Sequence, residues 1–187
     1  MSLTNFVVPT YTQMLKTLSA WLDKAQEQMG EDAETLLSCR LAPDMFPLAT
    51  QIRFACVQAQ EGVFRLMGAE FPSSLQELLD EGRGAGENPG SIASAKQRID
   101  ETIALLDGLP LDALDGDDGR PIEHALPMGM IFDLTAQQYA RDWTLPQFYF
   151  HLMIAYAILR NQGVALGKAD YVTHMLGYLR PGTMPSD

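Results

Sequence analysis

Few side chains in this chain could do chemistry at neutral pH, and one histidine is the most conspicuous of them. His151 lies in the stretch LPQFYFHLMIAYAILRNQGVALGK, residues 145–168, which is otherwise mostly apolar. An imidazole titrates near neutral pH, so it can serve as a general base or as a metal ligand. It can equally be a core histidine whose hydrogen bonds are satisfied by its neighbours, the usual state of a buried polar group. The residue type leaves these three roles open.

A polar stripe earlier in the chain offers His151 a partner. Asp44, Gln51, Gln58 and Arg65 recur every seven residues, which places them along one face of a helix. If the Gln51 side of that helix faces His151, a polar pocket between the two helices could bind a small molecule, with His151 as base or hydrogen-bond anchor. The expected pocket residues are Asp44, Gln51, Tyr149, His151, Tyr156 and Arg160. The alternative is a structural network in which Gln51 and His151 satisfy each other.

The remaining motifs argue against several kinds of site. The acidic turn DGDDG, residues 115–119, lacks the later ligand positions and the closing glutamate of a calcium loop. Cys39 and Cys56 have no short metal-binding spacing, and we expect both to be reduced thiols. The sequence contains no glycine-rich phosphate loop and no nucleophile elbow.

Length and charge narrow the class of protein. A chain of 187 residues favours one domain, and we expect that domain to span residues 1–187. Its net charge of -11 disfavours nucleic-acid binding, because an acidic surface repels phosphates. No signal-peptide pattern opens the sequence, and no apolar run approaches the ~20 residues of a membrane span. We therefore expect a soluble, cytoplasmic protein that binds neither nucleic acid nor membranes.

Apolar residues at helical spacing predict the first two long helices. The first covers about residues 6–29, with Pro9 near its first turn, where a missing N–H costs little. The second begins near Pro43, keeps Pro47 within its first turn and ends near Gly68. Its apolar residues appear on most sides, so it should be central to the fold.

The second half of the chain predicts two more helices and an irregular insert. Residues 80–90 are polar and glycine-rich, which is typical of a mobile loop, and a helix follows the N-cap Ser91. Residues 109–142 contain two short extended pieces that could pair as a hairpin, and the last long helix covers about 146–162. The tail, residues 171–187, is expected to form one short turn and a disordered end.

Together these elements predict an all-α fold, an up-down four-helix bundle with a short extended or hairpin insert before the last helix. Three blocks also carry a family resemblance: YTQMLKTLSAWLDKA, RLAPDMFPLATQIRFA and PQFYFHLMIAYAILRNQGVALGK, at residues 11–25, 40–55 and 146–168. They resemble the domain of unknown function 1993 (DUF1993), a family similar to the DinB/YfiT-like bundles, which include proteins regarded as metalloenzymes or thiol-dependent transferases. The resemblance implies the bundle fold and no particular reaction, because a fold does not fix a function.

The resemblance also implies where a metal would bind. DinB-like metalloproteins place one histidine on the second helix and two, four residues apart, on the last, so that three imidazoles can hold Zn, Ni or Fe. In this chain Gln51 stands about where the first ligand is expected, and Ala155 follows His151 in place of the last. We therefore expect no cofactor. A Zn or Ni site would have to recruit His174 or Asp44 to His151 in an unusual geometry.

Three functions compete on these grounds. The first is a degenerate, metal-free bundle whose small polar pocket binds an unknown small ligand. The second is an enzyme of hydrolase or transferase type, with or without metal, that uses His151 at that pocket. The third is a structural or interaction protein that works as a homodimer, with the broadly apolar first and second helices as its seam.

Overall fold

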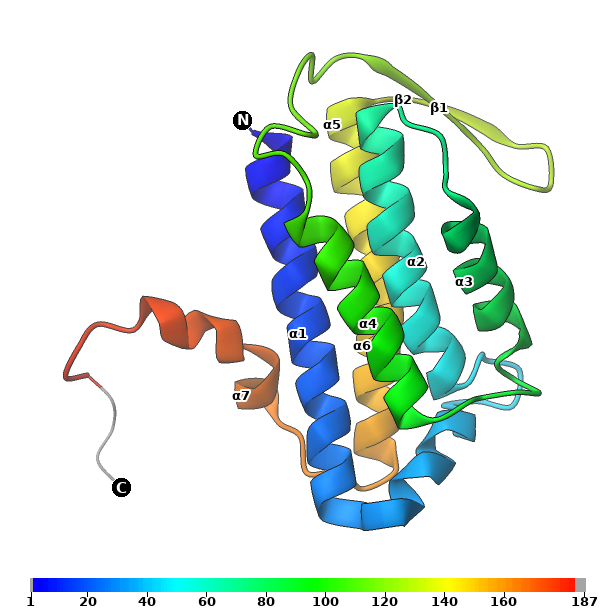
Figure 1. Ribbon diagram of the computed structural model, residues 1–187, viewed down its shortest axis with the longest axis vertical. Helices are drawn as coiled ribbons and strands as arrows, with labels where there is room; N and C mark the ends of the chain where they lie inside the picture. The colour runs from blue at the N-terminus through cyan, green and yellow to red at the C-terminus, as the bar shows by residue number, and fades with distance from the viewer. Residues whose placement is uncertain (1, 184–187) are drawn as a thin grey trace.

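Helices dominate the structure, and one small two-stranded sheet accompanies them in the part of the chain that is described. The computed structural model describes residues 2–183 (Figure 1). The long helices are α1 (Leu3–Met29), α2 (Leu48–Met67), α4 (Ile92–Asp107) and α6 (Leu145–Asn161). No helix within residues 2–183 combines the length and the apolarity that a membrane crossing needs. The last four residues of the tail, part of the predicted disordered end, lie outside the described range.

α1 begins earlier than the sequence pattern predicts. The hydroxyl of Ser2 accepts a hydrogen bond from the backbone N–H of Asn5, and Asp115 accepts from both the backbone N–H and the hydroxyl of Thr4. A carboxylate is favoured at a helix N-terminus, where the backbone N–H groups are unpaired. The helix therefore starts at Leu3, and Pro9 lies inside it instead of in its first turn, where the sequence pattern placed it.

α2 begins later than predicted. Pro47 takes the N-cap position in extended backbone, and the backbone N–H of Leu48 donates to the carbonyl of Cys39 at 2.9 Å. The segment before Pro47 is consequently a turn, and it leaves Asp44 exposed outside the helix. α6, α3 and α4 all pack against α2, which explains why apolar residues appear on most of its sides. The apolar surface of α2, which the sequence analysis considered as a possible dimer interface, is therefore covered by other helices of the same chain.

A short helix, α3 (Ser73–Gly84), is missing from the sequence-based prediction. It buries only Leu75, Leu78 and Gly82, so its apolar stripe is weak in the sequence. Its last turns occupy part of residues 80–90, which were predicted as a mobile loop. In Figure 1, α2 and α4 both run toward the end of the molecule that carries the hairpin, and α3, which comes between them in the chain, runs the opposite way on the other side of α2 from α4. The sequence predicted that the four long helices alternate in direction along the chain. They do not, because α2 and α4 run in the same direction.

The long helices enclose a single core. α4 and α6 each pack against both α1 and α2, with α4 in front of that pair and α6 behind it in Figure 1. Trp21 of α1, Leu48 of α2, Ile99 of α4 and Leu152 of α6 are all buried where the helices meet. Ser91 caps α4 as predicted, and its hydroxyl accepts from the backbone N–H of Ser94.

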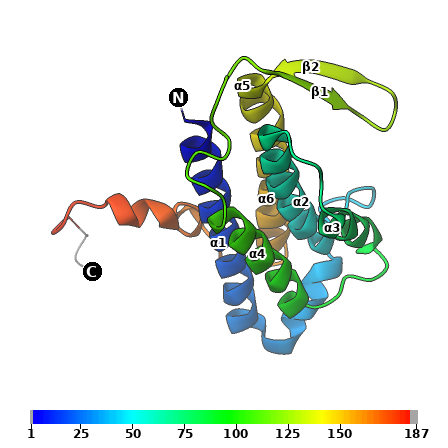
Figure 2. The same cartoon turned by 45° about the horizontal axis from the view of Figure 1, so that its top comes forward.

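The predicted hairpin is present. β1 (Pro121–Ala125) and β2 (Ile131–Thr135) pair antiparallel, with His124 opposite Phe132. The chain then enters α5 (Ala136–Gln138) and a π-helical turn at Tyr139–Thr144 that continues directly into α6. Figure 2 shows the hairpin extending across the end of the helices where α5 begins. It therefore places β1 side chains over one end of the core.

The chain after α6 forms an arm that leaves the body of the molecule. α7 (Lys168–Tyr171) and a 3₁₀ segment at Thr173–Tyr178 make up most of residues 168–183, which we call the C-terminal arm. Trp21 Nε1 donates to the carbonyl of Asp170 at 3.3 Å, and Lys24 pairs with its carboxylate at 2.8 Å. Beyond this root the arm projects away from the helices in both views (Figures 1 and 2).

Candidate functional site

The contact predicted between Gln51 and His151 is present. His151 Nδ1 lies 2.9 Å from Gln51 Oε1, and Gln51 Nε2 donates to the carbonyl of Phe46 at 3.2 Å. A carbonyl oxygen can only accept, so the amide nitrogen of Gln51 faces Phe46 and the amide oxygen faces His151. His151 must then donate Nδ1–H, and in the neutral ring Nε2 carries the free lone pair.

Burial keeps this imidazole neutral. Both side chains are buried, and burial lowers the pKa of His151 to about 4, because the charged form would lose its hydration. Gln51 is uncharged and does not compensate an imidazolium. Within residues 2–183, no protein group hydrogen-bonds Nε2 of His151. At neutral pH this nitrogen is a weak base that can accept a hydrogen bond.

Two aromatic rings pack edge-on against the ring of His151. Its ring lies 5.3 Å from that of Phe54 and 5.4 Å from that of Phe150, and Phe54 in turn contacts Phe46. Phe46 and Phe150 are about half exposed, so this aromatic row reaches the surface. A depression of about 530 Å³ begins at one end of the row, lined by Arg40, Phe46, Pro47, Arg83, Gly84, Gly86 and Glu87. A planar or apolar molecule could therefore approach from the aromatic side.

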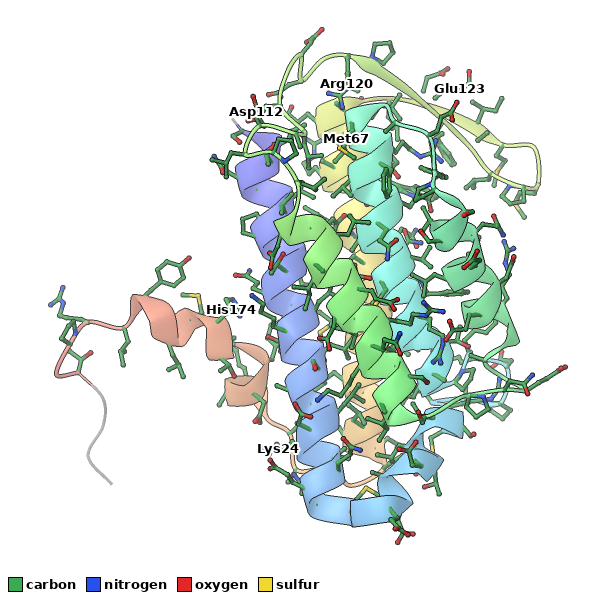
Figure 3. The ribbon with its side chains drawn as sticks, viewed as in Figure 1. Lys24, Met67, Asp112, Arg120, Glu123 and His174 are labelled. Carbon is green, nitrogen blue, oxygen red and sulfur yellow. The ribbon has the colours of Figure 1, made fainter. Side chains whose placement is uncertain are left out.

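The described residues do not assemble the three-ligand metal site of the DinB-like pattern. No group of three or more His, Cys, Asp or Glu side chains in residues 2–183 is placed to hold a metal. His174, the other candidate ligand, lies on the C-terminal arm (Figure 3), where it lines a cavity of about 250 Å³ against α1. Asp44 is exposed before α2, and Ala155 is buried with no ligand atom.

The other predicted pocket residues point elsewhere. Two residues along a helix correspond to a rotation of about 200°, so Tyr149 and His151 face nearly opposite sides of α6. Tyr156, on the Tyr149 side, packs its ring edge-on against Trp21 of α1 at 5.1 Å. Arg160 is exposed and donates to a main-chain carbonyl beyond the helix at 3.4 Å. The predicted six-residue pocket is therefore reduced to Gln51 and His151.

A second polar cluster, which the sequence did not predict, lies at the hairpin end of α2. The hydroxyls of Tyr11 and Thr144 are 2.7 Å apart and buried. Gly62 faces them, and a Cβ there would lie 2.3 Å from Thr144 Oγ1 and 2.8 Å from the Tyr11 hydroxyl. Burial raises the pKa of Tyr11 far above its ordinary value, so the phenol stays protonated. An isolated glycine inside a helical pattern was the available signal, since it often marks close packing.

His124, on β1, belongs to the same end of the molecule. Its buried ring lies 4.3 Å from Trp143 and 5.4 Å from Tyr139. Neither ring nitrogen has a hydrogen-bond partner in the described part of the chain. Burial is the main cause that lowers the pKa of His124, and the positive charge of Arg65 is the second. The carboxylate of Glu61, which pairs with Arg65 at 3.1 Å, opposes this shift weakly. Charging this imidazole would therefore be costly in the folded state.

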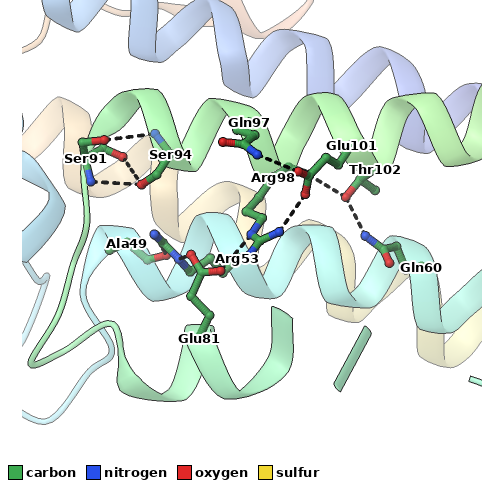
Figure 4. Close-up of polar contacts among 10 residues, drawn as sticks. All are labelled: Ala49, Arg53, Gln60, Glu81, Ser91, Ser94, Gln97, Arg98, Glu101 and Thr102. Atoms are coloured by element: carbon green, nitrogen blue, oxygen red, sulfur yellow. Dashed lines mark hydrogen bonds and ion pairs between the residues drawn. The ribbon is translucent and has the colours of Figure 1, made fainter. Parts of the chain in front are cut away.

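An ion-pair network joins α2, α3 and α4 (Figure 4). The carboxylate of Glu81 accepts from Arg53 Nε at 2.6 Å and from Arg98 Nε at 2.8 Å, while Arg53 also donates to the carbonyl of Ala49. Partial burial opposes ionisation of Glu81, but the two guanidinium groups outweigh it and lower its pKa. Because both guanidinium groups are engaged within the network, we assign it to structure and not to chemistry.

The two cysteines are free thiols, as predicted. Cys56 is buried, and burial raises its pKa to about 12, so it stays protonated at neutral pH. Cys39 is half-buried and donates to the carbonyl of Thr35 at 3.5 Å. Both therefore act as small core or near-core side chains.

Comparison with known proteins agrees with the resemblance seen in the sequence. A family model described as "Domain of unknown function (DUF1993)" matches residues 3–172. The crystal structure of a DinB family member protein from Shewanella denitrificans is similar to this one, with 31% sequence identity and a TM-score of 0.73. That match covers 98% of this chain and 96% of the other. No curated protein matches. The C-terminal arm beyond residue 172 lies outside the family model.

Proposed function

This chain belongs to the DUF1993 family, a domain of unknown function, and we propose that it is a metal-free, ligand-binding member of that family. The ligand is a small molecule that donates a hydrogen bond to Nε2 of His151 and places an apolar or aromatic body against the neighbouring rings. One observation carries the proposal: Gln51 fixes the tautomer of a buried, neutral histidine whose second nitrogen has no partner among residues 2–183.

The chemistry of Gln51 supports a site without metal. Its amide nitrogen is engaged with the carbonyl of Phe46, and its oxygen is engaged with His151. A neutral amide oxygen is in any case a weak ligand for Zn or Ni beside an imidazole. With Ala155 at the next inward position of α6, His151 is left as a single nitrogen donor, too few for a stable site.

The chemistry of His151 also favours binding over catalysis. A general base works best when its pKa lies near the working pH, and the pKa of His151 is about 4. The alternative, a hydrolase or transferase that uses His151 as its base, would need a substrate that raises this pKa on binding. A carboxylic acid or another group that shares its proton with Nε2 is the kind of substrate that could do so.

Metal and ligand titrations test the proposal together. We expect calorimetric titration of Zn²⁺ and of Ni²⁺ to show no stoichiometric site that depends on His151. We expect phenol, a planar hydrogen-bond donor, to shift the ¹⁵N resonance of His151 Nε2 and to lose that binding in His151→Phe. His174→Phe, which removes the imidazole of the arm, is the matched control and should leave both results unchanged. A 1:1 metal site lost in His151→Phe, or phenol binding that His151→Phe leaves intact, would contradict the proposal.

A further inference from the structure

The C-terminal arm carries a row of apolar side chains that no other part of the described chain covers. Met175, Leu176, Tyr178 and Leu179 are between 42% and 79% exposed. Isolated exposed apolar residues are common, but four within five positions make a contiguous patch of the kind found at interaction surfaces. The arm therefore presents an apolar face to solvent.

The arm is held out by specific contacts at its root. Tyr171 stacks on Trp21 at 6.4 Å, and Asp170 binds both Lys24 and the backbone N–H of Gly167. These contacts fix the point where the chain leaves α1. Thr173 and His174 still line a cavity against α1. Beyond them the arm projects away from the helices in both views (Figures 1 and 2), which leaves its apolar side chains exposed.

A second apolar surface lies on α6. Phe150 is 56% and Met153 40% exposed, and Phe46 adds a half-exposed ring next to Phe54 and His151. α6 packs mainly on α2 and α1, and no other helix of the described chain covers this outer side. We call Phe46, Phe150 and Met153 the α6 face. A helix that is apolar on nearly all sides is normally covered, which leaves the outer side of α6 in need of a partner.

Charge favours a second copy of this chain as that partner. The chain has a net charge of -11, so two copies repel each other over most of their surfaces. Residues 171–183 contain no Asp or Glu and include Arg180 and His174. Residues 143–169, which include α6, contain no Asp or Glu either, so a contact between the arm and α6 brings together two segments without carboxylate side chains. In a two-fold exchange each copy gives one arm and receives one, so the same pair of surfaces is used twice.

We propose that this protein forms a dimer in which the arm of each copy packs on the α6 face of the other. The arm residues Met175, Leu176, Tyr178 and Leu179 would cover Phe150 and Met153. Because Phe150 adjoins His151, the arm of the second copy would also close the aromatic side of the ligand site, a consequence that rests on the proposed function. The dimer itself does not depend on ligand binding.

Sedimentation equilibrium of the full chain tests the dimer. We expect a concentration-dependent dimer whose dissociation constant rises about tenfold or more in Leu176→Ser/Tyr178→Ser and in Phe150→Ser, as for residues central to an interface. Leu111→Ser is the control, since Leu111 is 90% exposed outside both surfaces and should dimerise normally. Circular dichroism melting confirms that each variant is folded. A wild-type monomer at its highest soluble concentration, or a dimer that both variants leave unchanged, would overturn the proposal.

Mixing the two variants tests which surfaces meet. The arm variant keeps its α6 face and the Phe150→Ser variant keeps its arm, so a mixture can form one intact contact per pair. We expect the mixture to dimerise more strongly than either variant alone. A mixture no stronger than either variant alone would overturn the arm-to-α6 exchange. A contact between like surfaces, arm to arm or α6 to α6, would instead weaken only one of the two variants. Phenol binding by a monomeric wild type would overturn only the dimer, and a dimer without phenol binding only the proposed function.

Discussion

Gln51 and His151 each satisfy a polar group of the other inside the core, so removing one should harm stability through the one that is left. Gln51→Leu leaves the Nδ1–H of His151 buried without an acceptor, and we expect a loss of about 2 kcal/mol in the free energy of unfolding. His151→Leu strands the amide of Gln51 in the same way. The double variant removes both polar groups and should be less destabilised than the sum of the single variants by about 1 kcal/mol.

Urea denaturation of the wild type, the two single variants and the double variant measures this coupling. Gln26→Leu in α1 is the control, because Gln26 is exposed and its replacement should change stability by less than about 0.5 kcal/mol. Strict additivity of Gln51→Leu and His151→Leu would mean that the two side chains do not depend on each other in solution. The tautomer assigned to His151 would then lose its support.

Among the six residues expected to line the pocket, the sequence correctly predicted the contact between Gln51 and His151. It placed the other four in a pocket that they do not share. The seven-residue recurrence placed Gln51 on one face of a helix, and the resemblance to the DinB-like metal sites paired that face with His151. Asp44 failed because a backbone hydrogen bond from Leu48 to Cys39 delays the start of α2, which no periodicity reveals. Tyr149, Tyr156 and Arg160 failed because sharing a helix with His151 does not mean sharing a face of it.

Because Gly62 has no side chain, α1 and the π-helical turn can pack close to α2 at this position. α1 supplies Tyr11, the π-helical turn supplies Thr144, and both hydroxyls occupy the space where a Cβ would sit on α2. We expect Gly62→Ala to cost about 2 kcal/mol, despite the better helix propensity of alanine, because the site is overpacked. Thermal or urea unfolding measures the loss.

Two further variants identify the cause of that loss. Thr144→Ala removes the hydroxyl nearest to the new Cβ, so Gly62→Ala should cost less in the Thr144→Ala background than in the wild type. Gly84→Ala, near the end of α3, places its Cβ in open space and should be nearly neutral. If Gly62→Ala proved as harmless as Gly84→Ala, the close approach of α1, α2 and the π-helical turn would be wrong.

Glu81 ties the helix that the sequence did not predict to the two that it did. Arg53 is buried, and Glu81 is the carboxylate that compensates its charge. Glu81→Gln keeps the shape and removes the charge, so we expect a loss of about 2 kcal/mol, less than for a fully buried pair because Glu81 is partly exposed. Glu77→Gln, exposed on the same helix, should be silent. Equal effects of the two variants in urea unfolding would show that Arg53 does not need Glu81.

The sequence correctly predicted the elements whose capping or turn residues lie within a few positions of one another. It missed the helix that depends on residues far away in the chain. Ser91 starts α4 by a capping pattern, and the hairpin is bounded by turn residues, so both are legible in a short window. α3 has only a few buried side chains and is stabilised by Arg53 and Arg98 from other helices. A helix held by partners distant in the sequence leaves little trace in its own residues.

Over the whole molecule, two kinds of titrating groups affect stability in different pH ranges. The ion-paired carboxylates, among them Glu81, Glu101 and Asp170, have lowered pKa values in the folded state. They favour folding above their ordinary pKa and lose that contribution only as the pH falls below about 4. The two buried histidines with lowered pKa values, His124 and His151, act at higher pH.

The sign of the histidine effect follows from proton counting. Unfolded histidine binds a proton near pH 6.5, whereas His151 in the folded protein does so only near pH 4. Between these values the unfolded state holds more protons, so the free energy of unfolding falls as the pH is lowered. For His151 the loss amounts to about 3 kcal/mol once the pH is below both values. His124 adds to it in the same direction.

Urea unfolding at about pH 7 and about pH 4.5 should therefore show a marked loss of stability in the wild type. His151→Leu lowers the stability at neutral pH because it strands the amide oxygen of Gln51. Both His151→Leu and His124→Leu should reduce the difference between the two pH values. His174→Leu, on the arm, should leave the difference as it is.

The net charge of -11 works in the opposite direction, because partial protonation of exposed carboxylates relieves repulsion near the lower pH. A wild type equally stable at both pH values, with both histidine variants more stable in acid than at neutral pH, would show that this relief outweighs a real histidine effect. An equal pH difference in the wild type and in all three variants would mean that burial does not keep either imidazole neutral.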